Sequence, residues 1–420
     1  MLTPEAPERG SSATRSTDGE TVLRFAPVAL ACAALLTATL AGCAPASPAV
    51  VTTSKPASRA SYRIATSSWP CAEHDSQRTS RTTAVVSSTP PARRWSLGQA
   101  SDSEPAIGPR GTLLLSVPDS GLWAVDGGTG RVRWKTGIES DSVAAAFENG
   151  DVVISSAVGA LLGQQAVVTM VDSSGRKIWQ SRIGRQASRS DGGSLVVGSP
   201  AIGDDGTIYV AVGNLGLFAL DPADGRVLWT FASTHNLADP TLGQDGTIYE
   251  LDDSVGLVAL KADGSVRWRV KSDAWFVTPP VVGPDGTIYL QEPSALRAVA
   301  PDGRDRWQLK LDVQGALGIG RDGTVYAPDP GNRLSAVSPK GRVRWVVKHG
   351  SHAALVDGKG HIVIQDGGSL YVFKADGSEL WHKDVGEETS AMPVVGPDGT
   401  IYVGDGTSPA SLNAWGGVPK

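Results

Sequence analysis

Side chains that could hold a metal ion or activate a nucleophile are sparse in this sequence. His349 and His352 form a close pair whose spacing could begin a metal site, but no third ligand accompanies them, and a solvated loop is the simpler interpretation. Acidic turns such as Asp204-Asp205-Gly206 could attract calcium, yet they lack the downstream glutamate of a dedicated calcium loop. No nucleophile elbow or phosphate-binding loop is visible. We therefore predict no catalytic residues and no metal site.

The cysteines indicate export rather than catalysis. An apolar run over residues 25–39 is too short to span a membrane but suits the apolar region of a secretory signal. It ends in Leu40-Ala-Gly-Cys43, which resembles the lipobox of bacterial lipoproteins. That resemblance implies that Cys43 is lipidated and becomes the new N-terminus, anchored to a membrane. Cys71 would then be the remaining thiol, either an unremarkable tether thiol or one that pairs with another chain.

Composition divides the chain into three parts. Residues 1–42 are predicted to be a lipoprotein signal peptide, although the four acidic side chains among residues 1–21 suggest a true start further downstream. Residues 43–91 are rich in Ser, Thr, Ala and Pro, which predicts a disordered tether. Residues 92–420 form the folded domain. Removing residues 1–42, with three Arg and four acidic residues, changes the net charge from −5 to −4, which does not suit nucleic-acid binding.

Two out-of-phase series of residues run through the folded part. Eight tight-turn glycines each open a strand-like run, at Gly111, Gly150, Gly206, Gly246, Gly286, Gly323, Gly360 and Gly399. Eight tryptophans precede them in turn, at Trp95, Trp134, Trp179, Trp229, Trp268, Trp307, Trp345 and Trp381. A period of about 36 to 40 residues identifies a structural repeat. Each unit contains four short apolar runs separated by turn signals, without helical periodicity, which predicts a four-stranded propeller blade.

The tryptophan series begins and ends before the glycine series, and this offset predicts a closed ring. None of the repeat tryptophans follows Gly399, whereas Trp95 is spare at the beginning of the array. We therefore predict an all-β, eight-bladed propeller whose last blade combines residues 396–415 with an N-terminal strand around residues 93–97. A solenoid is the competing architecture, but it would require polar caps at both ends.

The repeats resemble the pyrroloquinoline-quinone (PQQ)-like propeller family. The resemblance rests on Ala-Leu-Asp-x-x-x-Gly-x-x-x-Trp stretches such as the one from Ala219 to Trp229, and it covers residues 93–420. It implies that the eight tryptophans dock neighbouring blades together, and that ligands of the family's enzymes bind around the central channel. The vicinal cysteines and the calcium-binding and catalytic positions of those enzymes have no match here. Neither PQQ nor calcium is therefore expected as a cofactor.

Two insertions interrupt the repeat around Trp179. The interval from Gly150 to Trp179 is 29 residues and that from Trp179 to Gly206 is 27, against 21 to 23 and 15 to 18 elsewhere. We expect both insertions on one face of adjacent blades, where Leu161, Leu162, Arg185 and Arg189 could bind a partner. Neutral drift in loop length is the alternative.

The expected function follows from the anchor and the propeller together. With its lipobox the chain is similar in architecture to BamB-type outer-membrane assembly lipoproteins. That similarity implies a membrane-tethered, non-enzymatic scaffold in the bacterial cell envelope, with another envelope protein as its partner. An exported oxidoreductase that uses PQQ or acts on sugars is the first alternative, and a ligand-sensing propeller module is the second.

Overall fold

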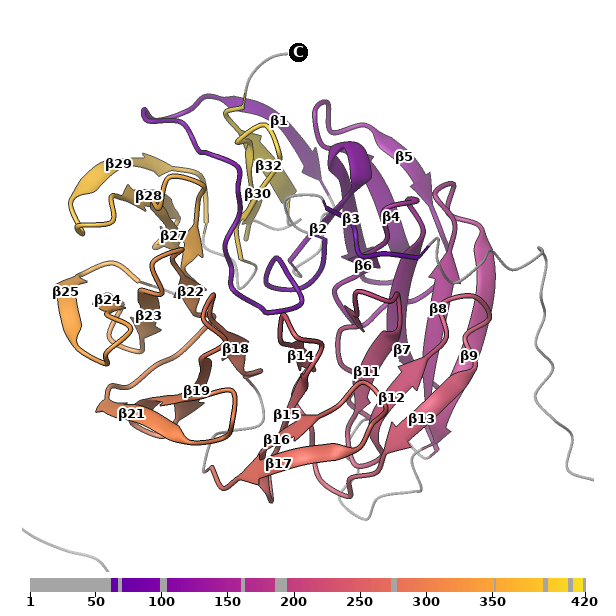
Figure 1. The fold of residues 1–420 in the computed structure, drawn as a ribbon. Coiled ribbons are helices and arrows are strands. Elements are labelled where there is room, and N and C mark those ends of the chain that lie inside the picture. The colour runs from indigo at the N-terminus through magenta and orange to yellow at the C-terminus, as the bar shows by residue number, and fades with distance from the viewer. Residues whose placement is uncertain are drawn as a thin grey trace, which may run out of the picture. The chain divides into compact units, whose positions relative to one another are not determined.

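The computed structural model describes residues 62–66, 70–98, 104–159, 163–185, 195–272, 278–350, 353–387, 392–406 and 411–417. They belong to one compact unit, Ala49–Lys420. These residues form eight four-stranded antiparallel sheets around a central axis, as predicted (Figure 1). Among them, the helical structure is the single turn η2 (Pro109–Gly111), and no helix is long and apolar enough to cross a membrane.

Blades are numbered from 1 to 8 in chain order. The first four blades are β2 (Ala106–Gly108), β3 (Thr112–Val117), β4 (Gly121–Asp126), β5 (Val132–Lys135); β6 (Ala145–Ala146), β7 (Val152–Val158), β8 (Gln165–Val171), β9 (Lys177–Arg185); β10 (Ala201–Ile202), β11 (Ile208–Val212), β12 (Gly216–Leu220), β13 (Val227–Phe231); and β14 (Thr241–Leu242), β15 (Ile248–Asp252), β16 (Gly256–Leu260), β17 (Val266–Val270). The last four are β18 (Val281–Val282), β19 (Ile288–Glu292), β20 (Ala295–Val299), β21 (Asp305–Lys310); β22 (Gly318–Ile319), β23 (Val325–Asp329), β24 (Arg333–Val337), β25 (Val343–Val347); β26 (Leu355–Val356), β27 (Ile362–Asp366), β28 (Ser369–Phe373), β29 (Glu379–Asp384); and β30 (Val394–Val395), β31 (Ile401–Asp405), β32 (Ser411–Trp415) with β1 (Arg93–Gly98).

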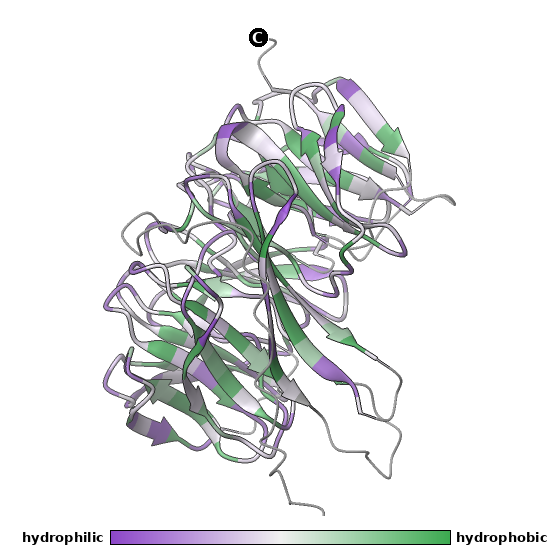
Figure 2. Cartoon of the chain, turned by 90° about the vertical axis from the view of Figure 1, so that its right-hand side faces the viewer, coloured by the Kyte–Doolittle hydropathy of each residue, from purple (hydrophilic) through white to green (hydrophobic). Residues whose placement is uncertain are grey.

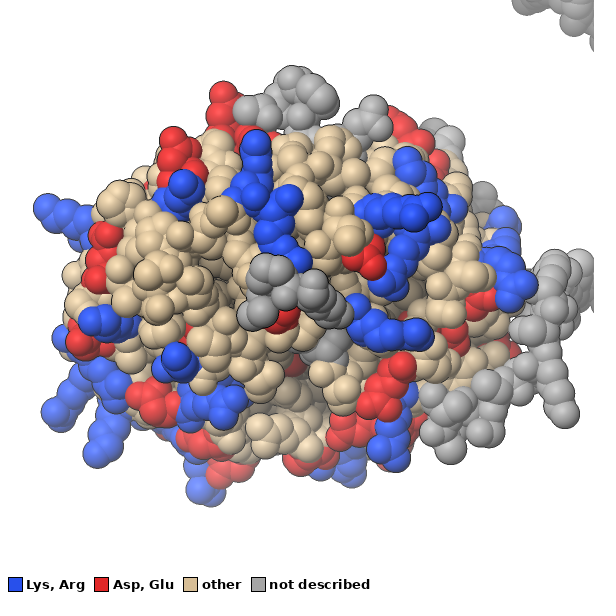
Figure 3. Space-filling view, turned by 90° about the horizontal axis from the view of Figure 1, so that it is seen from above, with Lys and Arg blue, Asp and Glu red and all other residues tan. Residues whose placement is uncertain are grey.

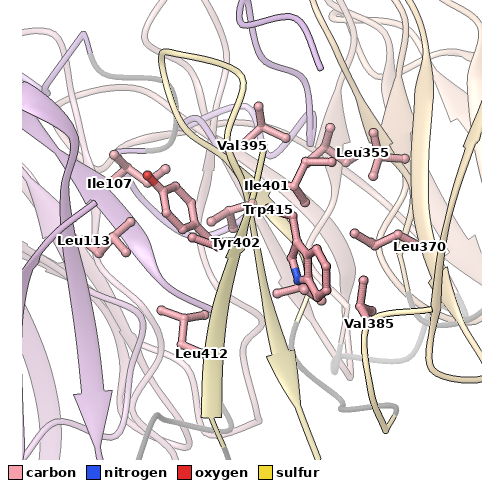
Figure 4. Packing of buried hydrophobic residues seen from close by; sticks show 14 of the residues in the cluster. Ile107, Leu113, Leu355, Leu370, Val385, Val395, Ile401, Tyr402, Leu412 and Trp415 are labelled. Atoms are coloured by element: carbon pink, nitrogen blue, oxygen red, sulfur yellow. The ribbon is translucent and has the colours of Figure 1, made fainter. Parts of the chain in front are cut away.

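The N-terminal strand closes the ring. β1 pairs antiparallel with β32, with Leu97 opposite Leu412 and Gly98 opposite Ser411. This pairing supplies the outermost strand of blade 8, which confirms the prediction made from the spare Trp95. The seam is also a packing centre, where Tyr402 and Trp415 of blade 8 lie in one buried cluster with residues of blades 1 and 7 (Figure 4). Apolar residues follow the strands, and many hydrophilic ones lie in the turns (Figure 2).

Seven of the eight tryptophans bind the neighbouring blade, and Trp381 binds Ser87, in the segment that precedes β1. In every case the indole N–H donates a hydrogen bond to a backbone carbonyl, on Gly127, Ser173, Pro222, Ala262, Pro301, Pro339, Ala375 and Ser87 in chain order of the tryptophans. For the seven tryptophans other than Trp381, the glycine of the next blade's third turn lies under the ring. At Gly264, whose φ is +82°, an added Cβ would approach Trp229 Cδ2 to 2.7 Å. Glycine is required there for both its backbone conformation and the close approach.

Four blades share a second recurring contact, which we call the turn clamp. An arginine directly before the blade's tryptophan reaches back to the aspartate and threonine of the Asp-Gly-Thr turn in the same blade. In blade 4, Arg267 Nη1 lies 2.9 Å from Asp245 Oδ2 and 2.8 Å from Thr247 Oγ1. The same three residue types meet in blades 5, 6 and 8, through Arg306 and Asp285, Arg344 and Asp322, and Arg94 and Asp398. The clamp links the outermost strand to the innermost turn.

The structure corrects the predicted tether. Residues 62–66 and 70–87, here called the channel segment, pack within the propeller instead of remaining disordered. Tyr62, Ala84 and Val86 are buried, and Ser80 and Thr82 are almost completely inaccessible. The prediction of a disordered tether over 43–91 is therefore wrong for this segment. The prediction rested on how little apolar surface this segment can bury. Its small polar residues are instead held chiefly by backbone hydrogen bonds. Residues 43–61 lie outside the described residues, as does Cys43.

Candidate functional site

The channel segment occupies the centre of the ring (Figure 1). The innermost strand of each blade pairs on one side only, so its other edge faces the axis. The amide N–H groups of Leu242, Val282, Ile319 and Val356, in the inner strands of blades 4 to 7, donate to the carbonyls of Ser76, Gln77, Thr79 and Ser80 at 2.7 to 3.0 Å. The segment therefore satisfies donors that would otherwise point into the channel.

Other parts of the channel segment bind the remaining blades. Ala146 of blade 2 donates its amide N–H to the carbonyl of Pro70, and Ser76 Oγ donates to the carbonyl of Ile202 in blade 3. Ala84 and Val86 join the buried cluster of blades 1, 7 and 8. One short stretch of chain therefore contacts all eight blades of the ring.

Charged residues of the channel segment and of blade 4 meet in the interior, where Arg78 and Glu250 are buried and Glu73 and Asp239 are partly buried. Arg78 is 3% exposed; its Nε donates to the carbonyl of Pro240, and its Nη2 lies 3.3 Å from Asp239 Oδ2. Burial raises the pKa of Glu73 to about 7, although the positive charge of Arg78 opposes the shift. A buried cation with carboxylates around it is stable only while its partners remain in place.

Glu250 is the anomalous member of this group. It lies on β15 and is completely buried, and neither carboxyl oxygen has a hydrogen-bond partner of normal geometry among the described residues. Leu290 and Ala327 occupy the corresponding positions of blades 5 and 6. Burial raises the pKa of Glu250 well above its ordinary value and Asp239 adds to the effect, while Arg78 and the Leu251 amide oppose it only partly. Glu250 therefore keeps its proton to a higher pH than an exposed glutamate does.

These raised pKa values predict that the fold weakens as pH rises. Glu73 and Glu250 hold a proton more tightly in the folded state, so the stability they contribute is complete below the ordinary glutamate pKa and is lost as pH rises. From Glu73 alone we expect the free energy of unfolding to fall by about 2 kcal/mol between pH 5 and pH 8, and Glu250 should make the fall steeper. Urea titrations at several pH values would measure this slope.

The control for this prediction is a matched pair of variants. Glu250→Gln should make the slope shallower, because the buried group no longer titrates, whereas Glu139→Gln, at an exposed glutamate, should leave it unchanged. Stability that increases from pH 5 to pH 8, or a slope insensitive to Glu250→Gln, would contradict this account.

The structure describes only one of the four predicted partner-binding residues. Leu161, Leu162 and Arg189 lie outside the described residues. Arg185 ends β9, where its backbone pairs with Gln165 of β8. The first insertion contributes to a longer hairpin, because β7 and β8 each have seven residues where β11 and β12 have five. The two insertions thus follow long strands of blade 2, and the patch itself stays a prediction.

The structure also shows the surroundings of the remaining candidate residues. Cys71 is 3% exposed, its Sγ lies 3.9 Å from the carbonyl oxygen of His74, and burial raises the pKa of its thiol. Of the two alternatives, an unremarkable tether thiol or a thiol that pairs with another chain, neither anticipated that Cys71 is buried within the propeller. His349 Nδ1 lies 3.0 Å from Asp366 Oδ2, and its ring stacks on Tyr371; His352 lies outside the described residues.

One set of potential metal ligands converges within the described part of the chain. His235, Asp252 and Asp253 each offer an atom within 4.8 Å of the others. Asp252 already accepts hydrogen bonds from the hydroxyl groups of Ser233 and Ser254. These hydrogen bonds account for the position of the Asp252 carboxylate without a metal ion. We therefore assign no metal to this set of residues.

Sequence reasoning missed the channel charges for a specific reason. Arg78 lies in a stretch whose composition predicts disorder, and only its contacts distinguish it. Glu250 did leave a signal, since the strand after the Asp-Gly-Thr turn reads Ile-Tyr-Glu in blade 4 and Ile-Tyr-Leu in blade 5. A comparison of the repeats position by position would have identified it.

Fold and repeats together define an eight-bladed propeller of PQQ-like units, in which the chain's own N-terminal segment fills the centre. The family model described as "Outer membrane protein assembly factor BamB" matches residues 163–252 and 217–374, which together span half of the chain. The chain therefore belongs to this family. A curated relative of the same description from Nitrosomonas eutropha is 28% identical over 123 residues, which cover 29% of this chain and 26% of the relative.

Solved structures extend the likeness in fold. BamB from Moraxella catarrhalis matches with a TM-score of 0.60 and 15% identity, covering 77% of this chain and 99% of that one. A europium-containing methanol dehydrogenase matches equally well, with a TM-score of 0.61 and 12% identity over 83% of this chain and 91% of that one. At these identities the likeness describes the fold alone, and the fold is shared by a scaffold and an enzyme.

Proposed function

We propose that this protein is an exported lipoprotein, anchored to a bacterial membrane through Cys43, that acts as a non-enzymatic scaffold for another envelope protein. Its family membership favours outer-membrane protein assembly as the process it serves. The observation that carries the proposal is the channel segment: where PQQ-like enzymes bind their ligands around the channel, this chain places its own residues 70–80. The surfaces left for function are the outer faces and loops.

The described residues do not favour a quinone cofactor in the channel. A flat cofactor on the axis would compete with Thr79 and Ser80, which bind the inner strands of blades 6 and 7, and with the buried Arg78. Ejecting them would expose the inner-strand amides and the carboxylates around Arg78. The proposal therefore includes no cofactor and no metal.

The partner surface belongs to the proposal as well. We propose that Leu161, Leu162, Arg185 and Arg189 form it, on the loops that follow the long strands of blade 2. Leucine and arginine side chains on neighbouring loops supply the apolar contact and the directional hydrogen bonds typical of interface anchors. Residues 43–61 would link this domain to the lipid.

Crosslinking in cells followed by mass spectrometry tests the proposal. The full-length chain should remain in the membrane fraction and crosslink to an envelope protein, whereas Cys43→Ala should release a folded chain into the soluble fraction. Deleting residues 186–193 should remove the crosslink without releasing the chain. An unchanged crosslink in that deletion would refute the partner surface, and an unlipidated Cys43 would refute the anchor. Dye-linked turnover by the purified protein with PQQ and calcium would refute the non-enzymatic assignment.

A further inference from the structure

In blade 1, an arginine stands where the turn clamp of other blades has its aspartate. The turn in blade 1 reads Gly108-Pro-Arg110-Gly-Thr112, whereas blades 5 and 8 read Gly-Pro-Asp-Gly-Thr at the corresponding positions. Blade 1 nevertheless keeps the clamp arginine, Arg133, directly before Trp134. The four other blades with an arginine at that position all pair it with a turn aspartate. Blade 1 is therefore a turn clamp without its carboxylate.

The arginine and the threonine of this clamp still meet, but the threonine hydroxyl has another acceptor. Thr112 Oγ1 donates to the carbonyl of Pro109 at 3.1 Å, whereas Thr247 Oγ1 in blade 4 donates to Asp245 Oδ2 at 2.8 Å. Arg133 Nη1 donates to Thr112 Oγ1 at 2.8 Å, the same distance as between Arg267 and Thr247 in blade 4. The carboxylate that Arg267 also contacts, at 2.9 Å, has no counterpart on the blade 1 turn. Arg133 instead turns its Nη2 toward Asp126 Oδ2, 2.7 Å away, on the neighbouring β4. The hydrogen bond from Arg133 lowers the pKa of Asp126.

Arg110 itself carries an uncompensated charge. It is exposed, and it forms no hydrogen bond or ion pair with any of the described residues. Its backbone has a φ of +60°, in the left-handed region that costs a residue with a Cβ about 1 kcal/mol. In the clamps of blades 4, 5, 6 and 8 this position is a turn aspartate that binds within its own blade.

A cleft lies where these residues meet, between blades 8 and 1. Its volume is about 720 Å³, and its lining includes Arg94, Arg110, Arg133, Asp126, Asp398 and Tyr402. Three guanidinium groups face two carboxylates there, and each carboxylate is already paired, Asp126 with Arg133 and Asp398 with Arg94. The cleft is thus one negative charge short. Figure 3 views the molecule from the side on which β1 and β32 lie in Figure 1, and Lys and Arg are numerous on that side.

We infer that this cleft binds a carboxylate from an acidic peptide segment. The carboxylate would take the place of the missing turn aspartate, between Arg110 and the Arg133–Thr112 pair. A carboxylate fits because the turn aspartate accepts hydrogen bonds from one arginine and one threonine hydroxyl group in blades 4, 5 and 6. In blade 1 the Thr112 hydroxyl would turn from the Pro109 carbonyl to the bound carboxylate. The cleft is large enough for a side chain with part of its backbone, rather than an isolated ion. The inference concerns described residues only and does not depend on the proposed lipid anchor.

Fluorescence polarisation with the full-length protein tests this inference, using a fluorescein-labelled hexaglutamate peptide in low salt. The decisive variant is Arg110→Asp, which restores the clamp of the other blades and should fold at least as well as the parent chain. It should weaken peptide binding by about tenfold or more, because a charge-assisted contact is lost and a repulsive charge is added. Arg321→Asp is the matched control, since this exposed arginine lies in the equivalent turn of blade 6, directly before Asp322.

The possible outcomes separate the inference from its alternatives. Binding to the parent chain and to Arg321→Asp, together with loss in Arg110→Asp, would support it. Equal weakening in both variants would show attraction by net charge and would overturn it. Binding of phosphatidylglycerol vesicles that depends on Arg110, without peptide binding, would assign the cleft to a membrane and would also overturn it. So would the absence of any peptide binding to the parent chain.

Discussion

A chain that begins at Ala92 should be much less stable than one that begins at Tyr62. The shorter chain retains β1, so its ring can still close, but it lacks the channel segment and exposes the inner-strand amides of blades 4 to 7. Loss of the hydrogen bonds made by the segment and of the burial of Val86 should lower the free energy of unfolding by about 5 kcal/mol, at roughly 1 kcal/mol per net hydrogen bond. Urea unfolding followed by tryptophan fluorescence measures this difference.

Adding the missing segment as a peptide provides the control. A synthetic peptide of residues 62–87 should stabilise the shorter chain in proportion to its concentration, because it binds only the folded ring. A peptide of the same composition in scrambled order should have no effect. Identical urea midpoints for the two chains would mean that the channel segment is not a structural part of the propeller.

Replacing Arg78 should have a large effect for a single substitution. Arg78→Met keeps a side chain of similar length but removes the cation beside Asp239 and Glu73, and it withdraws the hydrogen bond to Pro240. Breaking a buried ion pair by removing one partner typically costs about 3 to 5 kcal/mol. We expect a loss of that size at pH 7, measured by urea unfolding, and a smaller loss at pH 5, where Glu73 is protonated.

Two further variants make this test specific. Arg304→Met removes an arginine that is 86% exposed, and its pair with Asp302 should contribute less than about 1 kcal/mol. Adding Glu250→Leu to Arg78→Met should recover part of the loss, because one carboxyl group fewer is then left buried near the missing cation. Equal losses in Arg78→Met and Arg304→Met would show that the buried charges do not act as a group.

The part of the fold that repeats was predictable from the sequence. Tryptophans such as Trp229 and tight-turn glycines such as Gly246 recur because every blade is built from the same strands and turns, and eight recurrences of each identify eight blades. The spare Trp95 predicted closure because a ring needs the same number of strands in every blade. Residues that every blade needs recur at a fixed period, so they can be recognised from the sequence alone.

The departures from the repeat were harder to interpret. Arg110 and Glu250 are single changes in otherwise regular units, and their meaning depends on neighbours that are distant in sequence: Arg94 across the seam, and Asp239 with Arg78 beside the channel. The insertions around Trp179 are evident as lengths, yet a length alone does not specify which side chains meet.

By itself, the sequence determined the all-β repeat, the number of blades and the closing strand, because each of these depends on local patterns or on counting; the signal for export stays a prediction. Only the tertiary structure decided the role of residues 62–66 and 70–87. Ser76, Thr79 and Ser80 are residues that composition assigns to a disordered tether, and alone they cannot bury enough apolar surface to fold. They become ordered because a closed ring of inner strands presents unpaired amides toward its axis, and backbone carbonyls from any residue type can satisfy them.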